Sequence, residues 1–187
     1  MQEPFAIDEA VAAWQAYLDN VDDWRRLTDG VTAKNGGCGL VYELPNPSEV
    51  ERPDESFAIA DMRDLARDPG YSEPHYHPRL AAHPSRVTEI YLFLAGHAIC
   101  VAGSMERRVG SGDVVVTPPN TTHYVIPDAE TVLVAISTPP FMPESYIPVM
   151  ETDPLVGFDR AQLKRLTSEP KCDATEAAAA EQGQQSW

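Results

Sequence analysis

Three histidines and one glutamate, His75, His77, Glu89 and His123, form the densest group of metal-ligating side chains in this sequence. The segments that carry them have the composition of β-strands and are bounded by glycine and proline turns. One residue separates His75 from His77, so on a strand both side chains point to the same face. Imidazole and carboxylate groups on apolar strands cost free energy unless a partner satisfies them. The set suits a divalent ion such as iron, manganese, nickel, copper or zinc.

The middle of the chain alternates short apolar segments with turns. Strands are predicted over residues 57–62, 88–94, 98–102, 114–117, 123–126 and 132–136. Several short strands with regular turn signals predict an all-β sandwich or barrel. A further strand-like piece, Leu40 to Tyr42, lies in a segment rich in glycine and proline, and residues 139–147 are expected to leave the sheet as an extended segment.

Helices are expected at both ends of the chain. An apolar stripe at alternating steps of four and three predicts an amphipathic helix over residues 7–27, which packs on the barrel or against a partner subunit. A short helix is expected near residues 159–168. Residues 170–187 are rich in alanine, glutamate and glutamine and have little to bury, so we expect a disordered tail.

The metal-ligating group resembles the two sequence motifs of the cupin superfamily. In the first motif, His-x-His and a glutamate are followed by six residues and a glycine, as Glu89 is followed by Gly96. The second motif is Gly, five residues, Pro-x-Gly, two residues and His. Gly112, Pro118, Asn120 and His123 keep this spacing, and asparagine in place of glycine also tolerates a left-handed turn.

Two departures from the motifs concern the first half of the pattern. Gly70 precedes His75 by four residues where the family has five. Eleven residues separate His77 from Glu89 where the family usually has three or four. If Glu89 were displaced by this insertion, three histidines and water would still make an open metal site.

The resemblance implies an all-β fold built on a single cupin-like β-barrel of the jelly-roll type, with an N-terminal helix and a short C-terminal helix. It also implies a homodimer. The expected organisation is a helix and extended arm that pack on the barrel, the barrel itself, a C-terminal extension with the short helix, and the tail. The corresponding residues are 1–56, 57–147, 148–169 and 170–187.

Strand alternation predicts which side chains line the site. If Glu89 points inward, Tyr91 and Phe93 do so too, whereas Ile90, Leu92 and Leu94 pack behind the strand. The same rule puts Val125 beside His123. The expected pocket is one metal ion with aromatic and aliphatic walls, as in many small-molecule sites. Tyr91 is therefore a candidate catalytic residue, and Phe93 and Val125 are candidate substrate contacts; plain core packing is the alternative for the two aromatic residues.

The insertion over residues 78–87 begins and ends beside predicted metal ligands. It carries Arg79, His83 and Arg86 in a chain that is short of positive charge. One interpretation is a loop over the mouth of the site, in which the arginines hold an anionic substrate group and His83 is a catalytic, titratable residue. The alternative is a solvated surface hairpin. His97 follows a turn glycine and is interpreted as a surface residue.

Charge and cysteine content limit the classes of partner and the cellular location that the sequence favours. The formal net charge is −15, from 29 acidic and 14 basic residues, which argues against nucleic acid or an anionic membrane as the partner. No apolar run reaches the length of a membrane span, and no signal peptide is visible. The three cysteines are odd in number and far apart, which favours reduced thiols and a cytoplasmic location.

These observations leave three functions open. The favoured one is a metal-dependent enzyme that acts on a small organic metabolite, with Fe(II) as the favoured metal and dioxygenase or other oxygenase chemistry. The alternative is a metal-dependent isomerase or lyase, because the motif segments are also similar to those of cupin-type sugar-phosphate isomerases. A non-catalytic cupin that binds a small ligand is the third.

Overall fold

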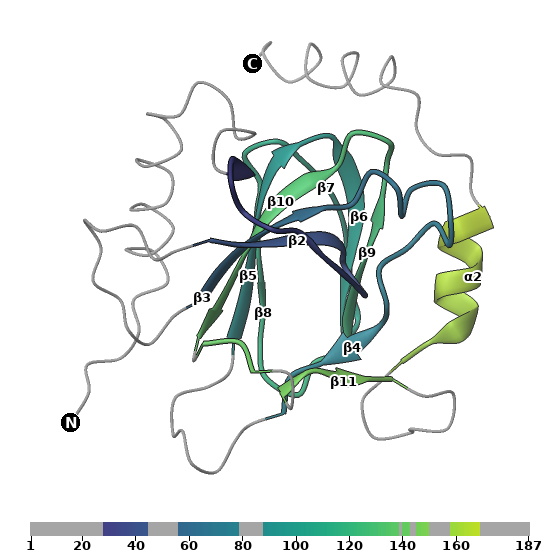
Figure 1. The fold of residues 1–187 in the computed structure, drawn as a ribbon. Helices are drawn as coiled ribbons and strands as arrows, with labels where there is room; N and C mark the ends of the chain where they lie inside the picture. Colours follow the sequence, from purple (N-terminus) through teal and green to yellow (C-terminus); the bar gives the residue numbers. More distant parts are fainter. Residues whose placement is uncertain are drawn as a thin grey trace, which may run out of the picture.

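In the computed structural model, the described residues form two antiparallel β-sheets that face each other, with one described helix on the outside of the pair (Figure 1). The structure describes residues 28–44, 56–78, 88–138, 140–142, 145–149 and 158–168. Three predicted segments lie outside these ranges: the helix over residues 7–27, the insertion beyond Pro78, and the tail after residue 170. The expected N-terminal helix is therefore not part of the fold described below.

The first sheet has six strands in the order β1-β2-β3-β10-β5-β8. Their bounds are β1 Lys34–Gly36, β2 Gly39–Leu44, β3 Ser56–Asp61, β10 Val132–Thr138, β5 Thr88–Ala95 and β8 Val114–Thr117. The second sheet has five strands in the order β11-β4-β9-β6-β7. Their bounds are β11 Ile147–Pro148, β4 His75–Tyr76, β9 His123–Pro127, β6 His97–Ala102 and β7 Met105–Gly110.

The pairings of the described strands form two separate sheets and not the single closed barrel that the cupin resemblance implied. Short strands stand at the edges where closure would have to occur. β8 has four residues and β11 has two, so they offer few backbone groups to a neighbouring strand. The all-β sandwich that the strand pattern allowed is the architecture observed.

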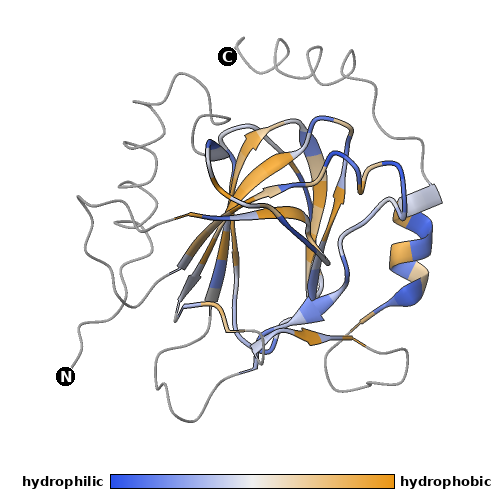
Figure 2. Ribbon diagram, viewed as in Figure 1, coloured by the Kyte–Doolittle hydropathy of each residue, from blue (hydrophilic) through white to orange (hydrophobic). Residues whose placement is uncertain are grey.

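Alternation along the strands divides the apolar side chains between two faces. The cluster between the sheets contains Ala60, Met62, Tyr91, Phe93, Ala98, Cys100, Val109, Val115, Val125 and Leu133. A second cluster lies on the other face of the six-stranded sheet and contains Phe57, Ile59, Ile90, Leu92, Val132, Val134 and Ile136. Figure 2 shows the apolar residues concentrated on the strands and on one side of the helix. Burial of the cluster between the sheets is the main force that holds the two sheets together.

The helix α2, Arg160–Ser168, confirms the short helix expected near residues 159–168. The Asp159 carboxylate caps its first turn, because Oδ1 accepts hydrogen bonds from the backbone N–H groups of Ala161 (2.8 Å) and Gln162 (3.2 Å). Leu163 and Leu166 then pack on the outer face of the five-stranded sheet. Their partners there are Val101, Tyr124 and Ile126.

Two turns set the register of the strands that carry the site. Gly96 joins β5 to β6 with φ +73°, and a Cβ there would come within 2.5 Å of the backbone of Glu130 and Thr131. Asn120 precedes β9 with φ +57° and is the one non-glycine residue in the described ranges with positive φ. Its N–H donates to the carbonyl of His77 (2.8 Å), so the predicted left-handed turn also fixes the backbone of a candidate metal ligand.

The sequence pattern missed several strands. β7 carries exposed charged residues because it is an edge strand, so no apolar alternation marks it. β4 has only two residues and was not among the predicted spans, although His75 was expected on a strand. β1 was not predicted, whereas the strand-like piece from Leu40 to Tyr42 falls within β2, and both strands join the six-stranded sheet. β11 lies at the end of the segment that was expected only to be extended.

The central cluster yields a stability prediction. Leu133 is fully buried between the sheets, so Leu133→Ala should lower the free energy of unfolding by about 2–5 kcal/mol through lost apolar burial and the cavity left behind. Urea denaturation measures this change. Met105→Ala is the matched control, because Met105 is 37% exposed on an edge strand, and it should change stability by less than about 0.5 kcal/mol. Equal losses in the two variants would contradict the assignment of the core.

Candidate metal centre

Both sheets contribute to one buried cluster of ligating side chains. His75 lies on β4 and His123 on β9, where the two residues are register partners in the five-stranded sheet. Glu89 lies on β5 of the six-stranded sheet, and His77 follows β4. Their ligand atoms all lie within 4.8 Å of one another, and all four residues are buried. The four residues singled out from sequence therefore meet in space, although eleven residues separate His77 from Glu89.

Each imidazole is oriented by its Nδ1 atom. The hydrogen bonds run from His75 to the carbonyl of Glu73 (2.8 Å), from His77 to that of Ser145 (2.8 Å), and from His123 to that of Thr121 (2.9 Å). A carbonyl oxygen only accepts, so each Nδ1 carries the proton in its neutral ring. The remaining ring nitrogen, Nε2, then presents a lone pair, which is the form that binds a metal.

The three Nε2 atoms converge on one carboxylate oxygen. Oε2 of Glu89 is 2.9 Å from Nε2 of His123, 3.3 Å from that of His77 and 3.8 Å from that of His75. Lone pairs that face a carboxylate in a buried site repel one another unless a cation lies among them. The donor set of three imidazoles and one carboxylate therefore fits a divalent transition metal. This geometry supports a metal site of the kind found in cupins.

The electrostatics of the cluster agree with an ionised carboxylate. Burial alone would raise the pKa of Glu89, but in the metal-free cluster the imidazoles of His123, His75 and His77, which donate hydrogen bonds to it when protonated, outweigh burial and hold the pKa well below its usual value. Burial and the neighbouring His123 lower the pKa of His75. Burial also acts to lower the pKa of His77, but its hydrogen bond to Glu89 raises the pKa overall, so a proton competes with a metal ion for this nitrogen.

Tyr91 is hydrogen-bonded to the ligand cluster. Its phenol donates to Oε2 of Glu89 (2.7 Å), and Thr117 Oγ1 donates to the Glu89 backbone carbonyl (2.8 Å). Burial and the adjacent Glu89 carboxylate raise the pKa of Tyr91 well above its usual value. The phenol therefore stays protonated at neutral pH and acts as a hydrogen-bond donor beside the candidate metal site.

The other residues singled out from the sequence lie in three different places. Phe93 and Val125 lie in the cluster between the sheets, on the same strand faces as Glu89 and His123. His97 is exposed and its ring lies 3.6 Å from Asp128, in keeping with its interpretation as a surface residue. The predicted loop residues Arg79, His83 and Arg86 lie outside the described residues.

Two aromatic residues beside the ligands were not predicted. The ring of Tyr146 stacks on His75 with centroids 4.1 Å apart and planes at 23°. The ring of Phe141 stands edge-on to His77 at 6.3 Å and is 43% exposed. Both come from the irregular segment after β10, where strand alternation gives no orientation. Their only sequence signal is the presence of two aromatic residues in a proline-rich segment beside the site.

The two described cysteines are free thiols, and the pKa of each is raised. Burial raises the pKa of Cys100 to about 12, and burial together with Glu89 and Glu73 raises the pKa of Cys38. Both thiols are therefore protonated at neutral pH and are poor nucleophiles and poor metal ligands. Cys172 lies outside the described residues.

Comparisons with known proteins identify the fold. No family model matches the sequence, and no match was found among curated proteins. Among solved structures, the nucleoside dehydratase Pac13 from Streptomyces is 13% identical over 65% of this chain and 87% of its own, with a TM-score of 0.50. A variant of Streptomyces Pac13 with uridine is 12% identical over 66% of this chain and 88% of its own, with a TM-score of 0.51. An RmlC-like cupin from Shewanella frigidimarina is 12% identical over 59% of this chain and 86% of its own, with a TM-score of 0.43.

The chain shares its fold with Pac13, over about two thirds of its length. The four ligating residues that the motif spacing singled out occupy one site in this fold. In the described part of the chain, no helix is both long and apolar enough to cross a membrane.

The cluster yields a prediction for metal content. His75→Ala and His123→Ala should each remove most of the bound metal, because each deletes one of three imidazole ligands from a buried site. Elemental analysis of protein purified without added metal should find about one ion per chain in the unmodified protein and little in either variant. His97→Ala is the matched control and should keep its metal. Full occupancy in both ligand variants would remove the basis for this site.

Proposed function

We propose that this protein is a metal-dependent cupin-type enzyme that acts on a small organic metabolite, with Fe(II) as the metal and oxygenase chemistry as the reaction. The observation that carries the proposal is the convergence of three Nε2 lone pairs on the Glu89 carboxylate. A divalent ion held there has a net charge of about +1 after the carboxylate is counted, and a six-coordinate ion keeps positions for other ligands. Such an ion supplies redox capacity and coordination positions for an organic substrate and dioxygen.

The surroundings of the cluster support oxygen chemistry. Phe93, Val115, Val125 and Leu133 belong to the buried apolar cluster between the sheets, together with Tyr91. An apolar wall excludes water and limits side reactions of oxidising species. It also suits a substrate with an apolar body, so Phe93 and Val125 keep their proposed roles as substrate contacts.

A lyase or isomerase is the second candidate, and Tyr91 is the observation that favours it. Its protonated phenol lies 2.7 Å from the Glu89 carboxylate, where it can deliver a proton to a leaving oxygen or an enolate. A Lewis-acid metal and one proton donor are sufficient for elimination of water or for isomerisation. Pac13 is described as a nucleoside dehydratase, so a protein of this fold is known to perform an elimination.

Further parts of the proposal concern residues beyond the described ranges and the assembly. Arg79 and Arg86 would hold an anionic group of the substrate, and His83 would serve as a base at the mouth of the site. The partners proposed are a small-molecule substrate and a second copy of the chain in a homodimer. Loss of substrate affinity in Arg79→Ala with unchanged metal content would support this role for the loop. Unchanged kinetics would instead favour the alternative interpretation of the loop as a surface hairpin.

Reconstitution separates the two chemical classes. Apo-protein should be loaded with iron(II), manganese(II) or zinc(II), and turnover of candidate metabolites should be followed with and without dioxygen. The oxygenase proposal predicts turnover with iron(II) only, with dioxygen consumed in step with substrate. Full activity with zinc(II) under nitrogen would reject it and establish the lyase or isomerase.

A second test uses Tyr91→Phe, which removes the phenol proton and keeps the ring. If Tyr91 is the general acid of a lyase, turnover should fall by about 100-fold or more while metal content stays near that of the unmodified protein. An oxygenase needs the phenol only as a hydrogen-bond donor to Glu89. Its turnover should therefore fall by about tenfold or less, in proportion to the loss of metal affinity. Metal content and single-turnover rates distinguish the two outcomes.

A further inference from the structure

Three contacts hold the ring of His75 from two directions. Its Nδ1 donates to the backbone carbonyl of Glu73 (2.8 Å), and its face stacks on the ring of Tyr146 at 4.1 Å. The phenol of Tyr146 then donates to Oε2 of the same Glu73 (2.8 Å). Glu73 therefore contacts His75 in two ways. Its backbone carbonyl accepts the Nδ1 hydrogen bond, and its carboxylate positions the Tyr146 ring that stacks on the face of the imidazole.

His75 differs in this respect from the other two imidazoles. His77 and His123 each have a backbone acceptor, but their described aromatic contacts are edge-on or tilted, as with Tyr146 on His77 (6.2 Å, 69°) and Tyr91 on His123 (5.9 Å, 61°). Within the described residues, the near-parallel stack of Tyr146 is specific to His75. His75 is also the imidazole whose Nε2 lies farthest from Glu89 Oε2, so its position depends least on the carboxylate.

The turn between β1 and β2 packs against the pair formed by Glu73 and Tyr146. The Glu73 N–H donates to the carbonyl of Gly37 (2.8 Å). A Cβ at Gly37 would overlap Tyr146 Oη and would come 2.8 Å from Glu73 Oε2. Only glycine leaves room for this hydrogen bond, so a methyl group at residue 37 would displace the pair without removing either of its functional groups.

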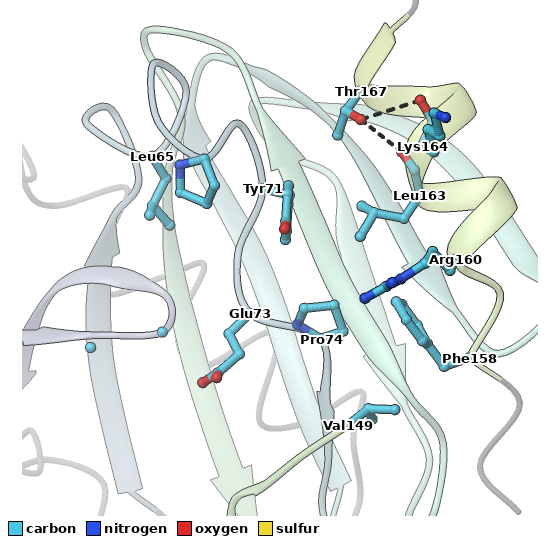
Figure 3. A pocket seen from close by; sticks show the side chains of 13 residues that line it. Leu65, Tyr71, Glu73, Pro74, Val149, Phe158, Arg160, Leu163, Lys164 and Thr167 are labelled. Atoms are coloured by element: carbon cyan, nitrogen blue, oxygen red, sulfur yellow. Dashed lines mark hydrogen bonds between the residues drawn. The ribbon is translucent and has the colours of Figure 1, made fainter. Parts of the chain in front are cut away.

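Glu73 is not one of the residues whose ligand atoms converge. It lines a cavity of about 740 Å³ between residues 65–74 and helix α2 (Figure 3). Glu73 is exposed, whereas His75 is only 1% exposed. The described contacts of Glu73 with the site are the hydrogen bond of its backbone carbonyl with His75 and that of its carboxylate with Tyr146. Solvent can satisfy its carboxylate when the phenol is removed.

We propose that Glu73 and Tyr146 are a positioning pair that fixes His75 and thereby sets the affinity of the site for its metal ion. Residues that orient an imidazole ligand typically change metal affinity by about 10- to 100-fold when they are altered. The inference deepens the proposed function and rests on the metal site described above. It assigns a role to a phenol and a carboxylate that do not touch the ion.

Cobalt(II) is a suitable probe because its visible absorption reports ligand geometry as well as occupancy. Tyr146→Phe and Glu73→Ala should each raise the cobalt(II) dissociation constant about tenfold, measured by competition with a chelator, and should shift the visible bands. Glu73→Gln should restore affinity close to that of the unmodified protein, because the amide oxygen accepts the same hydrogen bond. Gly37→Ala should weaken binding too, although it leaves both side chains of the pair in place.

Tyr71→Phe is the matched control. Tyr71 lines the same cavity but packs in the cluster against α2, so loss of its hydroxyl should leave cobalt(II) affinity and spectrum unchanged. Tyr146→Phe keeps the ring that stacks on His75 and leaves the exposed Glu73 carboxylate to solvent, so this variant is expected to fold. It therefore tests the positioning pair even if Glu73→Ala does not fold.

The outcomes separate this inference from the proposed function. Unchanged affinity and spectrum in Tyr146→Phe, with tight binding by the unmodified protein, would overturn the positioning pair alone. A lower melting temperature of the metal-free variant with unchanged affinity would show a purely structural role and would also overturn it. Failure of the unmodified protein to bind cobalt(II) would reject the metal site itself and this inference with it.

Discussion

The convergence of three imidazole lone pairs on one buried carboxylate oxygen is the constraint on which the rest of this structure depends. His75 and His123 come from one sheet and Glu89 from the other, so the cluster links the two layers at one end of the sandwich. Each imidazole has its proton committed to a backbone carbonyl. The backbone thereby selects the tautomer, and the three rings present only acceptor nitrogens where they meet. A cation is the group that makes this arrangement favourable.

The surrounding fold serves this arrangement in two ways. Strand alternation on β5 and β9 sends Glu89, Tyr91 and Val125 toward the space between the sheets, while their neighbours pack on the opposite faces. The apolar cluster lowers the local dielectric and strengthens every charge interaction in the site. Irregular segments supply the remaining orientation, because the carbonyls that hold the three Nδ1 atoms belong to residues next to strands and not to the paired positions within them.

The sequence predicted those parts of the structure that follow from strand alternation or from a motif spacing. The ligands, the inward face of β5 and the left-handed Asn120 followed from strand period, motif spacing and turn chemistry. β7 could not be found in this way, because an edge strand with exposed charges has no apolar alternation. Tyr146 could not be placed either, because its orientation arises from a long-range hydrogen bond to Glu73 in an irregular segment. Closure into a barrel was an inference from resemblance, and the described strands pair as two sheets.

The central claim is that one ion is held by three imidazoles and one carboxylate. X-ray absorption at the metal edge of the metal-loaded protein tests this ligand set directly. The account predicts a shell of nitrogen and oxygen neighbours with the outer-shell scattering of about three imidazole rings and no sulfur, because both described thiols are protonated at neutral pH. A spectrum without imidazole scattering, or one with a sulfur neighbour, would contradict it.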